Sequence, residues 1–173
     1  DNEGITSESQ GRVLVNSVAK ATASGKNVVI LDPGHGGSSG ASRVYNGVRY
    51  YEDVLALEIA NACKEKLEKS KEVTVYLTRN TNVNVSFADR TNLAKNKGAA
   101  VLVSFHLNST GTNSTTATGA EAICQNNNYN ALVGGMSRQL AQIMVNKLAG
   151  LGLINRGVYY KNSSGTKYPD GSV

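Results

Sequence analysis

Residues 28–37 read VVILDPGHGG, so an apolar run ends in a turn that carries His35 among glycines. The other histidine of the chain, His106, ends a second apolar run, residues 99–106, which read AAVLVSFH. Each run has the length and composition of a buried strand. If the two strands are parallel, both imidazoles reach the same edge of the sheet, and that edge is where α/β folds build their sites. This arrangement predicts a metal site.

A third ligand is offered by Glu52, which lies in the stretch YYED at residues 50–53, where a helical pattern begins. The helix dipole favours a carboxylate in the first turn, and the Gly/Ser-rich loop after His35 can bring this carboxylate toward the imidazole. Two histidines and one glutamate leave a fourth position for water, which is the ligand set of a catalytic zinc site. Taken singly, each residue has a plainer interpretation, as the polar end of a strand or as a helix cap.

The spacing of apolar residues predicts the order of the elements. The predicted strands span residues 27–31, 73–78, 99–105 and 120–125, and another begins at 156–158. The predicted helices span residues 52–70, 86–96 and 131–149. Apolar residues at every fourth position of two helices are expected to face the core: Leu55, Ile59, Cys63 and Leu67, and Met136, Leu140, Met144 and Leu148. Alternating strands and helices predict an α/β fold, a mostly parallel twisted sheet with helices on both faces and the zinc site at the C-terminal edge of the strands.

The domain organisation is simple. Residues 1–26 are rich in Ser, Asn, Gly and Ala, and we interpret them as a linker or peripheral arm. Residues 27–173 then form one catalytic domain, long enough for a substantial core. Residues 33–49 are expected to be a loop with five glycines. A phosphate-binding loop is excluded there, because that motif needs a helix directly behind it and here the helix waits until Glu52.

Composition and charge limit the kinds of molecule that the protein is expected to bind. The chain has 18 basic and 13 acidic residues, a net charge of +5 and a pI near 9.2. The charges are mixed along the chain, which argues against a nucleic-acid partner, although an anionic cell-wall polymer is compatible. No apolar run is long enough to span a membrane. Cys63 and Cys124 fit two interpretations, a disulfide or two small buried hydrophobic residues, and their apolar contexts favour the second.

Six sequence blocks, in this order and spacing, resemble the zinc-dependent N-acetylmuramoyl-L-alanine amidases of bacterial cell-wall metabolism. The blocks are residues 29–37, Glu52, residues 77–79, Arg90 with residues 92–94, residues 104–108 and residues 119–121. The resemblance runs from about residue 27 to 158. It implies that His35, Glu52 and His106 bind Zn²⁺. It also implies hydrolysis of the amide bond between N-acetylmuramic acid and L-alanine in peptidoglycan, by a secreted or cell-wall-associated bacterial enzyme.

The chain departs from this family in one respect. The family's general base is a glutamate on a late strand, and this sequence has no glutamate after Glu121. We therefore expect a fragment that binds zinc but cleaves poorly by itself, with the base outside the chain and Glu121 as the remaining candidate within it. Asn108, Arg79 and Glu121 are expected to contact substrate, although Asn108 could instead hold the loop after His106, and Arg79 and Arg90 could pair with carboxylates.

An alternative function follows if the chain is complete at Val173. It would then be a zinc-containing module that binds the cell wall without hydrolysing it. A strand bearing a glutamate beyond residue 173 would favour the hydrolase, and a stop codon there would favour the binding module.

Overall fold

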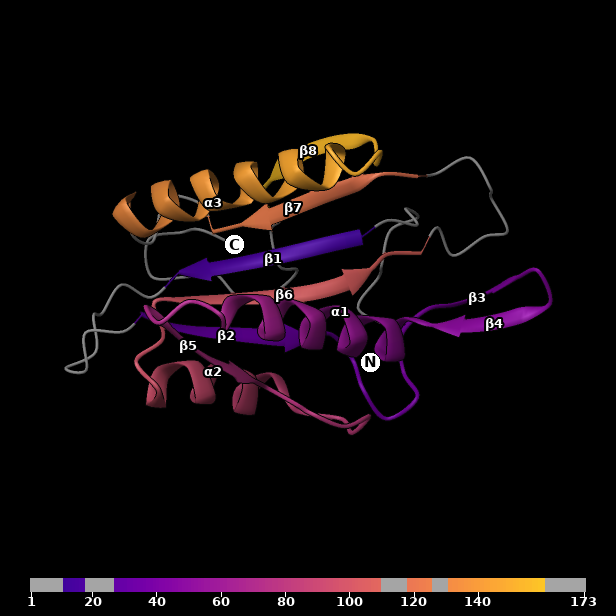
Figure 1. The fold of residues 1–173 in the computed structure, drawn as a ribbon, viewed down its shortest axis with the longest axis horizontal. Coiled ribbons are helices and arrows are strands. Elements are labelled where there is room, and N and C mark those ends of the chain that lie inside the picture. Colours follow the sequence, from indigo (N-terminus) through magenta and orange to yellow (C-terminus); the bar gives the residue numbers. More distant parts are fainter. Residues whose placement is uncertain (1–10, 18–26, 110–117, 126–130, 161–173) are drawn as a thin grey trace.

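The structure is a computed structural model that describes residues 11–17, 27–109, 118–125 and 131–160. Its strands are β1 (Gly11–Ser17), β2 (Asn27–Pro33), β3 (Ser42–Tyr45), β4 (Val48–Tyr51), β5 (Val73–Leu77), β6 (Val101–Leu107), β7 (Ala120–Cys124) and β8 (Asn155–Tyr159). Its helices are α1 (Glu52–Leu67), α2 (Phe87–Asn96) and α3 (Ala131–Ala149) (Figure 1). The prediction of an α/β fold is confirmed.

Six strands form one sheet in the order β5-β2-β6-β1-β7-β8. Neighbouring strands are parallel except at the β6–β1 pair, which is antiparallel. The sheet therefore has two parallel halves that run in opposite directions. The C-terminal ends of β2 and β6 and the N-terminal ends of β7 and β8 consequently lie at the same edge (Figure 1).

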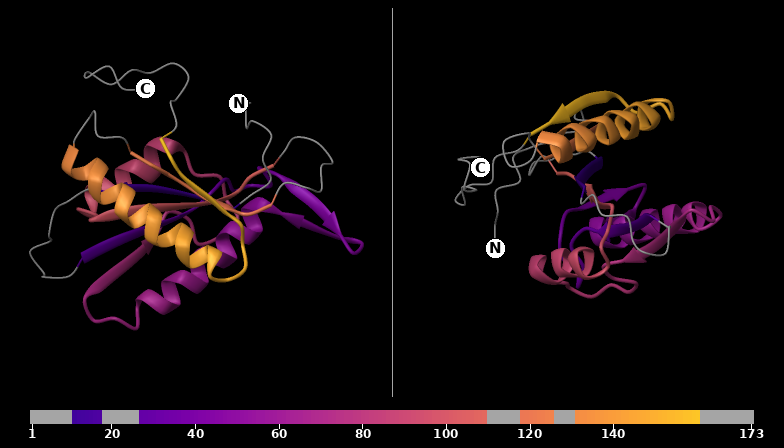
Figure 2. Two further views of the ribbon diagram at one scale, coloured as in Figure 1. Left: turned by 90° about the horizontal axis from the view of Figure 1, so that it is seen from above. Right: turned by 90° about the vertical axis from the view of Figure 1, so that its left-hand side faces the viewer.

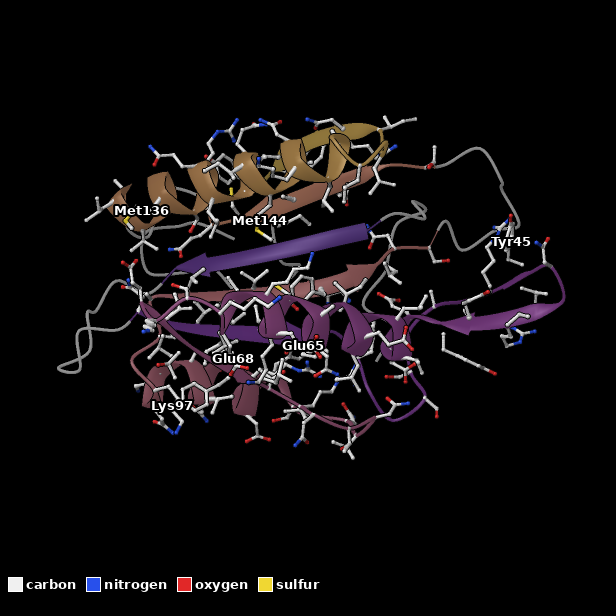
Figure 3. All side chains as sticks on the ribbon, viewed as in Figure 1. Tyr45, Glu65, Glu68, Lys97, Met136 and Met144 are labelled. Carbon is white, nitrogen blue, oxygen red and sulfur yellow. The ribbon has the colours of Figure 1, made fainter. Side chains whose placement is uncertain are left out.

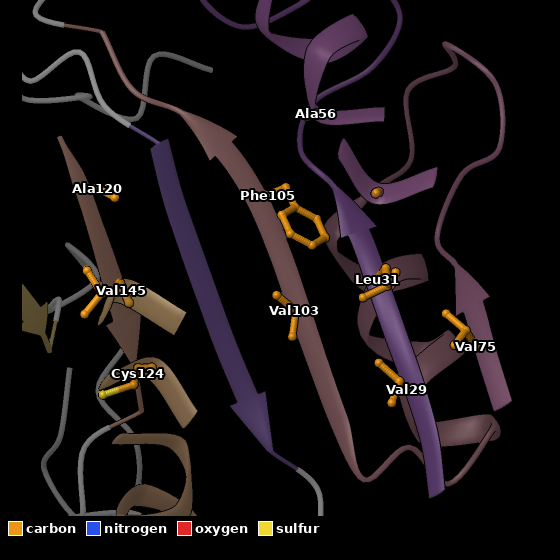
Figure 4. Packing of buried hydrophobic residues seen from close by; sticks show 12 residues of the cluster. Val29, Leu31, Ala56, Val75, Val103, Phe105, Ala120, Cys124 and Val145 are labelled. Atoms are coloured by element: carbon orange, nitrogen blue, oxygen red, sulfur yellow. The ribbon is translucent and has the colours of Figure 1, made fainter. Parts of the chain in front are cut away.

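The strand β2 shows why helices cover both faces of the sheet. Its side chains alternate, so that Val29 and Leu31 join one buried cluster and Val28 and Ile30 join another. The first cluster, shown in Figure 4, includes residues of α1 and α3. The second cluster includes Ala94 of α2. Figure 2 shows α2 on the opposite side of the sheet from α1 and α3. The prediction of helices on both faces is confirmed.

The helix faces that meet the sheet match the expected stripes only in part. Five stripe residues pack against the core cluster: Cys63, Leu67, Leu140, Met144 and Leu148. The fully buried positions of α1 and α3 are mostly small residues, including Ala56, Ala60 and Ala141. Two residues of the expected stripes, Ile59 and Met136, are instead exposed to solvent. Small side chains let the helix axis approach the sheet, while larger residues beside them, such as Cys63, Leu140 and Met144, fill the margins of the contact.

Residues 11–17 form a strand inside the sheet, where the sequence favoured a linker or peripheral arm. β1 lies between β6 and β7 and pairs with β6 along its whole length and with β7 over residues 11–15. The apolar stretch VLV at residues 13–15 was the signal, and it was too short to decide the matter without its two neighbours. The rest of the expected arm, and residues 161–173 of the expected domain, lie outside the described residues.

The expected loop at 33–49 contains most of a β-hairpin, which β3 and β4 form with each other alone. Asn46 and Gly47 connect the strands, and both have positive φ angles of 49° and 77°. Such a pair is the typical connection of a type I′ hairpin, so the sequence did contain a signal for this element.

Two further predictions concern the described part of the chain. Cys63 and Cys124 are both free, and both pack with the same apolar cluster. None of the helices has the length and hydropathy that a membrane span requires.

Candidate metal centre

The two histidines lie at the ends of neighbouring parallel strands. Pro33, the last residue of β2, pairs with Phe105 of β6, and the backbone N–H of Gly34 donates to the carbonyl of Phe105 at 2.9 Å. His35 follows with a φ of 57°, a left-handed conformation that is uncommon for a residue with a side chain. Its ring meets the ring of His106 edge to face, with the centroids 4.7 Å apart.

Glu52, the first residue of α1, completes a group of three potential ligands. Its Oε1 atom lies 3.2 Å from Nε2 of His35 and 3.2 Å from Nδ1 of His106, and the two nitrogens are 3.1 Å apart. One ligand atom from each residue lies within 4.8 Å of the others. The structure thus brings the three predicted ligands together around a volume that one ion would fill.

Backbone groups hold the Glu52 carboxylate in place. The N–H of Ala41 donates to Oε2, and the N–H of Leu107 donates to Oε1, each at 2.8 Å. Burial alone would raise the pKa of Glu52, but hydrogen bonds from His106, His35 and Ala41 outweigh it and hold this pKa well below its usual range. The carboxylate is therefore ionised at neutral pH, as a metal ligand must be.

Two glycines leave room for the imidazoles. A Cβ atom on Gly34 would lie 2.4 Å from Cε1 of His106, and one on Gly40 would lie 2.7 Å from Cδ2 of His35. Real Cβ atoms essentially never make contacts this short, so a side chain at either position would displace one of the two histidine rings. These two glycines therefore leave the space that the histidine rings of the candidate metal centre occupy.

Arg79 holds the His35 turn from within the protein. Its side chain is buried, and its guanidinium donates to the carbonyls of Pro33 at 3.0 Å, Gly34 at 2.8 Å and Asp53 at 2.6 Å. This corrects the expectation that Arg79 contacts substrate. Because carbonyl oxygens of β2, the turn and α1 occupy its donors, Arg79 fixes the relative position of the segments that carry His35 and Glu52.

Arg90 acts on the same turn from α2. It forms a buried ion pair with Asp32 at 2.5 Å and donates to the carbonyls of Pro33 at 2.9 Å and His35 at 2.6 Å. The Ser104 hydroxyl also donates to the Asp32 carboxylate, at 2.6 Å. Pairing with a carboxylate was the default expectation for Arg90. Asp32 was overlooked, although a carboxylate inside an apolar strand signals a buried partner.

Asn108 and Glu121 lie together at the same sheet edge. The amide of Asn108 donates to Oε1 of Glu121 at 2.9 Å, and Nε of Arg156 lies 3.8 Å from Oε2. Arg12 of β1 pairs with both His106 and Glu121, so these two residues are two strand spacings apart. Their backbones are therefore roughly 10 Å from each other, and Glu121 is not part of the His-Glu-His group.

Sequence comparison finds similar proteins among bacterial cell-wall enzymes. The chain is 31% identical over 125 residues to the N-acetylmuramoyl-L-alanine amidase AmiC of Escherichia coli, covering 64% of this chain and 29% of that protein. It is 44% identical over 85 residues to the sporulation-specific N-acetylmuramoyl-L-alanine amidase of Bacillus subtilis, covering 48% of this chain and 32% of that protein. The matches span about a third of these relatives' length.

Solved structures give the same result for the fold. An N-acetylmuramoyl-L-alanine amidase from Clostridium difficile superposes with a TM-score of 0.67 at 34% identity, covering 80% of this chain and 71% of that one. The catalytic domain of CwlV from Paenibacillus polymyxa superposes with a TM-score of 0.62 at 28% identity, covering 83% and 76%. The sequence profile of one family matches residues 29–171, which include every element of the metal centre. This chain belongs to the N-acetylmuramoyl-L-alanine amidase family.

Proposed function

We propose that this chain is a zinc-dependent hydrolase that cleaves the amide bond between N-acetylmuramic acid and L-alanine in peptidoglycan. The observation that carries the proposal is the convergence of His35, Glu52 and His106 at one edge of the sheet. Membership of the amidase family supports the choice of substrate. We further propose that the protein works outside the cytoplasm, at the bacterial cell wall, because that is where this polymer lies.

The residues fit zinc by their chemistry. Two imidazole nitrogens and one carboxylate oxygen are common zinc ligands, and three protein ligands leave a position open for water or substrate. When bound there, zinc would polarise the scissile carbonyl and lower the pKa of a bound water to about 7. The ionised Glu52 and the turn that Arg79 and Arg90 hold would keep the ligand atoms in place before an ion arrives.

Two further polar residues, Asn108 and Glu121, lie at this edge of the sheet, and we propose a different role for each. Asn108 follows His106 closely and is fixed by Glu121, so its amide is positioned to meet a substrate group at the edge. Glu121 is proposed to orient Asn108. It is a poor candidate for the general base, because a base must lie within hydrogen-bond reach of the proton that it accepts, and Glu121 lies two strands from His106.

The experiment is a measurement of zinc content and of stem-peptide release for the parent chain and for His106→Ala. We expect the parent to carry about one zinc ion per chain and to release stem peptide slowly, because Glu121 is a poor candidate for the general base. We expect the variant to lose tight zinc binding and the remaining activity, because one of three ligands is gone. The variant should keep its circular dichroism spectrum, since the core does not depend on the imidazole. Gln142→Ala, an exposed position on α3, is the matched control.

The outcomes separate the two candidate functions. Stem-peptide release by the parent that disappears in His106→Ala supports the hydrolase. A parent chain that carries zinc and binds purified peptidoglycan without releasing peptide would contradict hydrolysis by this chain and favour the binding module. Zinc that binds His106→Ala as tightly as the parent would show that the ligand assignment is wrong.

A further inference from the structure

The proposed reaction assigns no role to the β3–β4 hairpin, yet the hairpin is joined directly to the candidate metal centre. It lies between the two ligands His35 and Glu52 in the sequence. At its base, the N–H of Glu52 donates to the carbonyl of Ala41, and the N–H of Ala41 donates to the Glu52 carboxylate, each at 2.8 Å. These two bonds fix the hairpin relative to a metal ligand.

Many side chains of the hairpin are apolar or aromatic, although they are exposed to solvent. Every residue of both strands is exposed, although a two-stranded hairpin is only marginally stable alone. Its exposed apolar side chains are Val44, Tyr45, Val48, Tyr50 and Tyr51. Apolar surface that neither face of the hairpin buries is typical of an interaction site.

The pairing of the strands divides these side chains between two faces. Arg43 pairs with Tyr50 and Tyr45 pairs with Val48, so these four residues share one face. Tyr45 and Tyr50 are 65% and 43% exposed there. Figure 3 shows Tyr45 beyond the sheet edge that carries the metal centre, at the end of the molecule opposite Met136.

The chemistry of this face suits a sugar chain. Each pyranose ring has an apolar C–H face and a polar rim, and tyrosine offers a flat apolar ring with a hydroxyl at its end. Arg43 adds a cationic side chain to this face, and the hairpin sequence SRVYNGVRYY contains no carboxylate, so the face repels no acidic group of a cell-wall polymer. We infer that Tyr45 and Tyr50 of the hairpin hold the glycan strand of peptidoglycan beside the metal centre. This inference rests on the proposed function, because that function places a muramic acid residue at the metal.

The test is calorimetric titration of the full chain with peptidoglycan glycan strands from which the stem peptides have been removed. This probe has no scissile amide, so it reports binding without catalysis. We expect the double variant Tyr45→Ser/Tyr50→Ser to bind at least about tenfold more weakly than the parent, since exposed aromatic anchors dominate such contacts. Tyr45→Phe/Tyr50→Phe, which keeps both rings, should bind within about threefold of the parent.

Two controls distinguish this role from a general loss of apolar surface. Val44→Ser changes the opposite face of the hairpin, and Met136→Ser removes a side chain of similar exposure at the far end of the molecule. Both should bind like the parent, and zinc content should be unchanged in all variants. On intact peptidoglycan, the double serine variant should raise KM and leave kcat unchanged, because binding common to the ground and transition states is lost.

Failure of this inference is distinguishable from failure of the proposed function. A parent chain that does not bind the stripped glycan, or a double serine variant that binds it as tightly as the parent, overturns the inference even if stem peptides are released. A parent chain that binds the glycan through the hairpin but releases no stem peptide overturns the hydrolase alone.

Discussion

At the scale of single residues, the candidate metal centre depends on two glycines, because their lack of a side chain leaves space for the histidine rings. The ring of His106 occupies the space where Gly34 would carry a side chain, and the ring of His35 does the same at Gly40. His35 itself adopts a left-handed backbone conformation that costs of the order of 1–3 kcal/mol. The hydrogen bond from Arg90 to the carbonyl of His35 helps to stabilise this conformation.

The first prediction concerns Gly34→Ala. The added methyl group would lie 2.4 Å from the His106 ring, so the ring must move away from Glu52 and His35. We expect zinc affinity to fall by about 10- to 100-fold, the range found when the surroundings of a metal ligand are disturbed. Competition with a chelator of known affinity measures this loss.

The matched control is Gly135→Ala on α3, where an added Cβ meets no atom within 4 Å. Zinc affinity should be unchanged there, and stability should be equal or up to about 1 kcal/mol higher because alanine favours a helix. If Gly34→Ala binds zinc like this control, the crowding described for His106 does not govern the site.

At the scale of elements, one buried carboxylate joins most of the secondary structure around the site. Asp32 at the end of β2 accepts hydrogen bonds from Thr78 after β5, from Arg90 of α2 and from Ser104 of β6. Arg90 continues this network into the His35 turn. The position of the turn relative to the sheet is therefore fixed by polar contacts, while the apolar clusters fix the helices.

The second prediction is that Arg90→Met lowers the free energy of unfolding by about 3–5 kcal/mol, because it leaves Asp32 as a buried charge without its cation. Zinc affinity should fall with it, since the carbonyl of His35 loses its donor. Urea unfolding monitored by circular dichroism measures the first effect. Lys64→Met, which removes the cation of an exposed pair with Glu68, should change the stability by no more than about 1 kcal/mol; equal effects would contradict the assigned difference in burial.

At the scale of the whole molecule, one apolar cluster connects both halves of the sheet. It contains residues of β2, β5 and β6 beneath α1 and residues of β7 beneath α3. Cys63 and Cys124 belong to these two parts, and burial raises the pKa of both thiols. A raised pKa lowers the thiolate fraction, and the thiolate is the reactive form.

The third prediction follows from this shared core. In the folded protein at pH 8, both cysteines should react with iodoacetamide far more slowly than in urea, and they should gain reactivity over the same urea range because one core exposes both. Mass spectrometry of the alkylated peptides measures the two rates. Fast labelling of Cys124 in the native protein would contradict its placement in the core.

Local patterns in the sequence predicted most of the helices and strands and the three candidate ligands. Apolar periodicity is a local property, so it located the three helices and every strand of the main sheet except β1 to within a few residues, and α3 was predicted at residues 131–149 as observed. The two histidines and Glu52 were recognisable because each follows or opens such an element, and parallel β2 and β6 necessarily bring their ends together.

The faces that these elements present to one another could not be predicted from local patterns. The apolar periodicity of α1 favoured the face that carries Ile59, but the sheet meets the face with Ala56 and Ala60, because the backbones can approach there. Arg79 was expected at the substrate, but the carbonyls of the His35 turn surround its guanidinium. The strand β1 lies between β6 and β7 through hydrogen bonds to residues about a hundred positions away. These outcomes depend on contacts between distant segments, and a local pattern does not contain them.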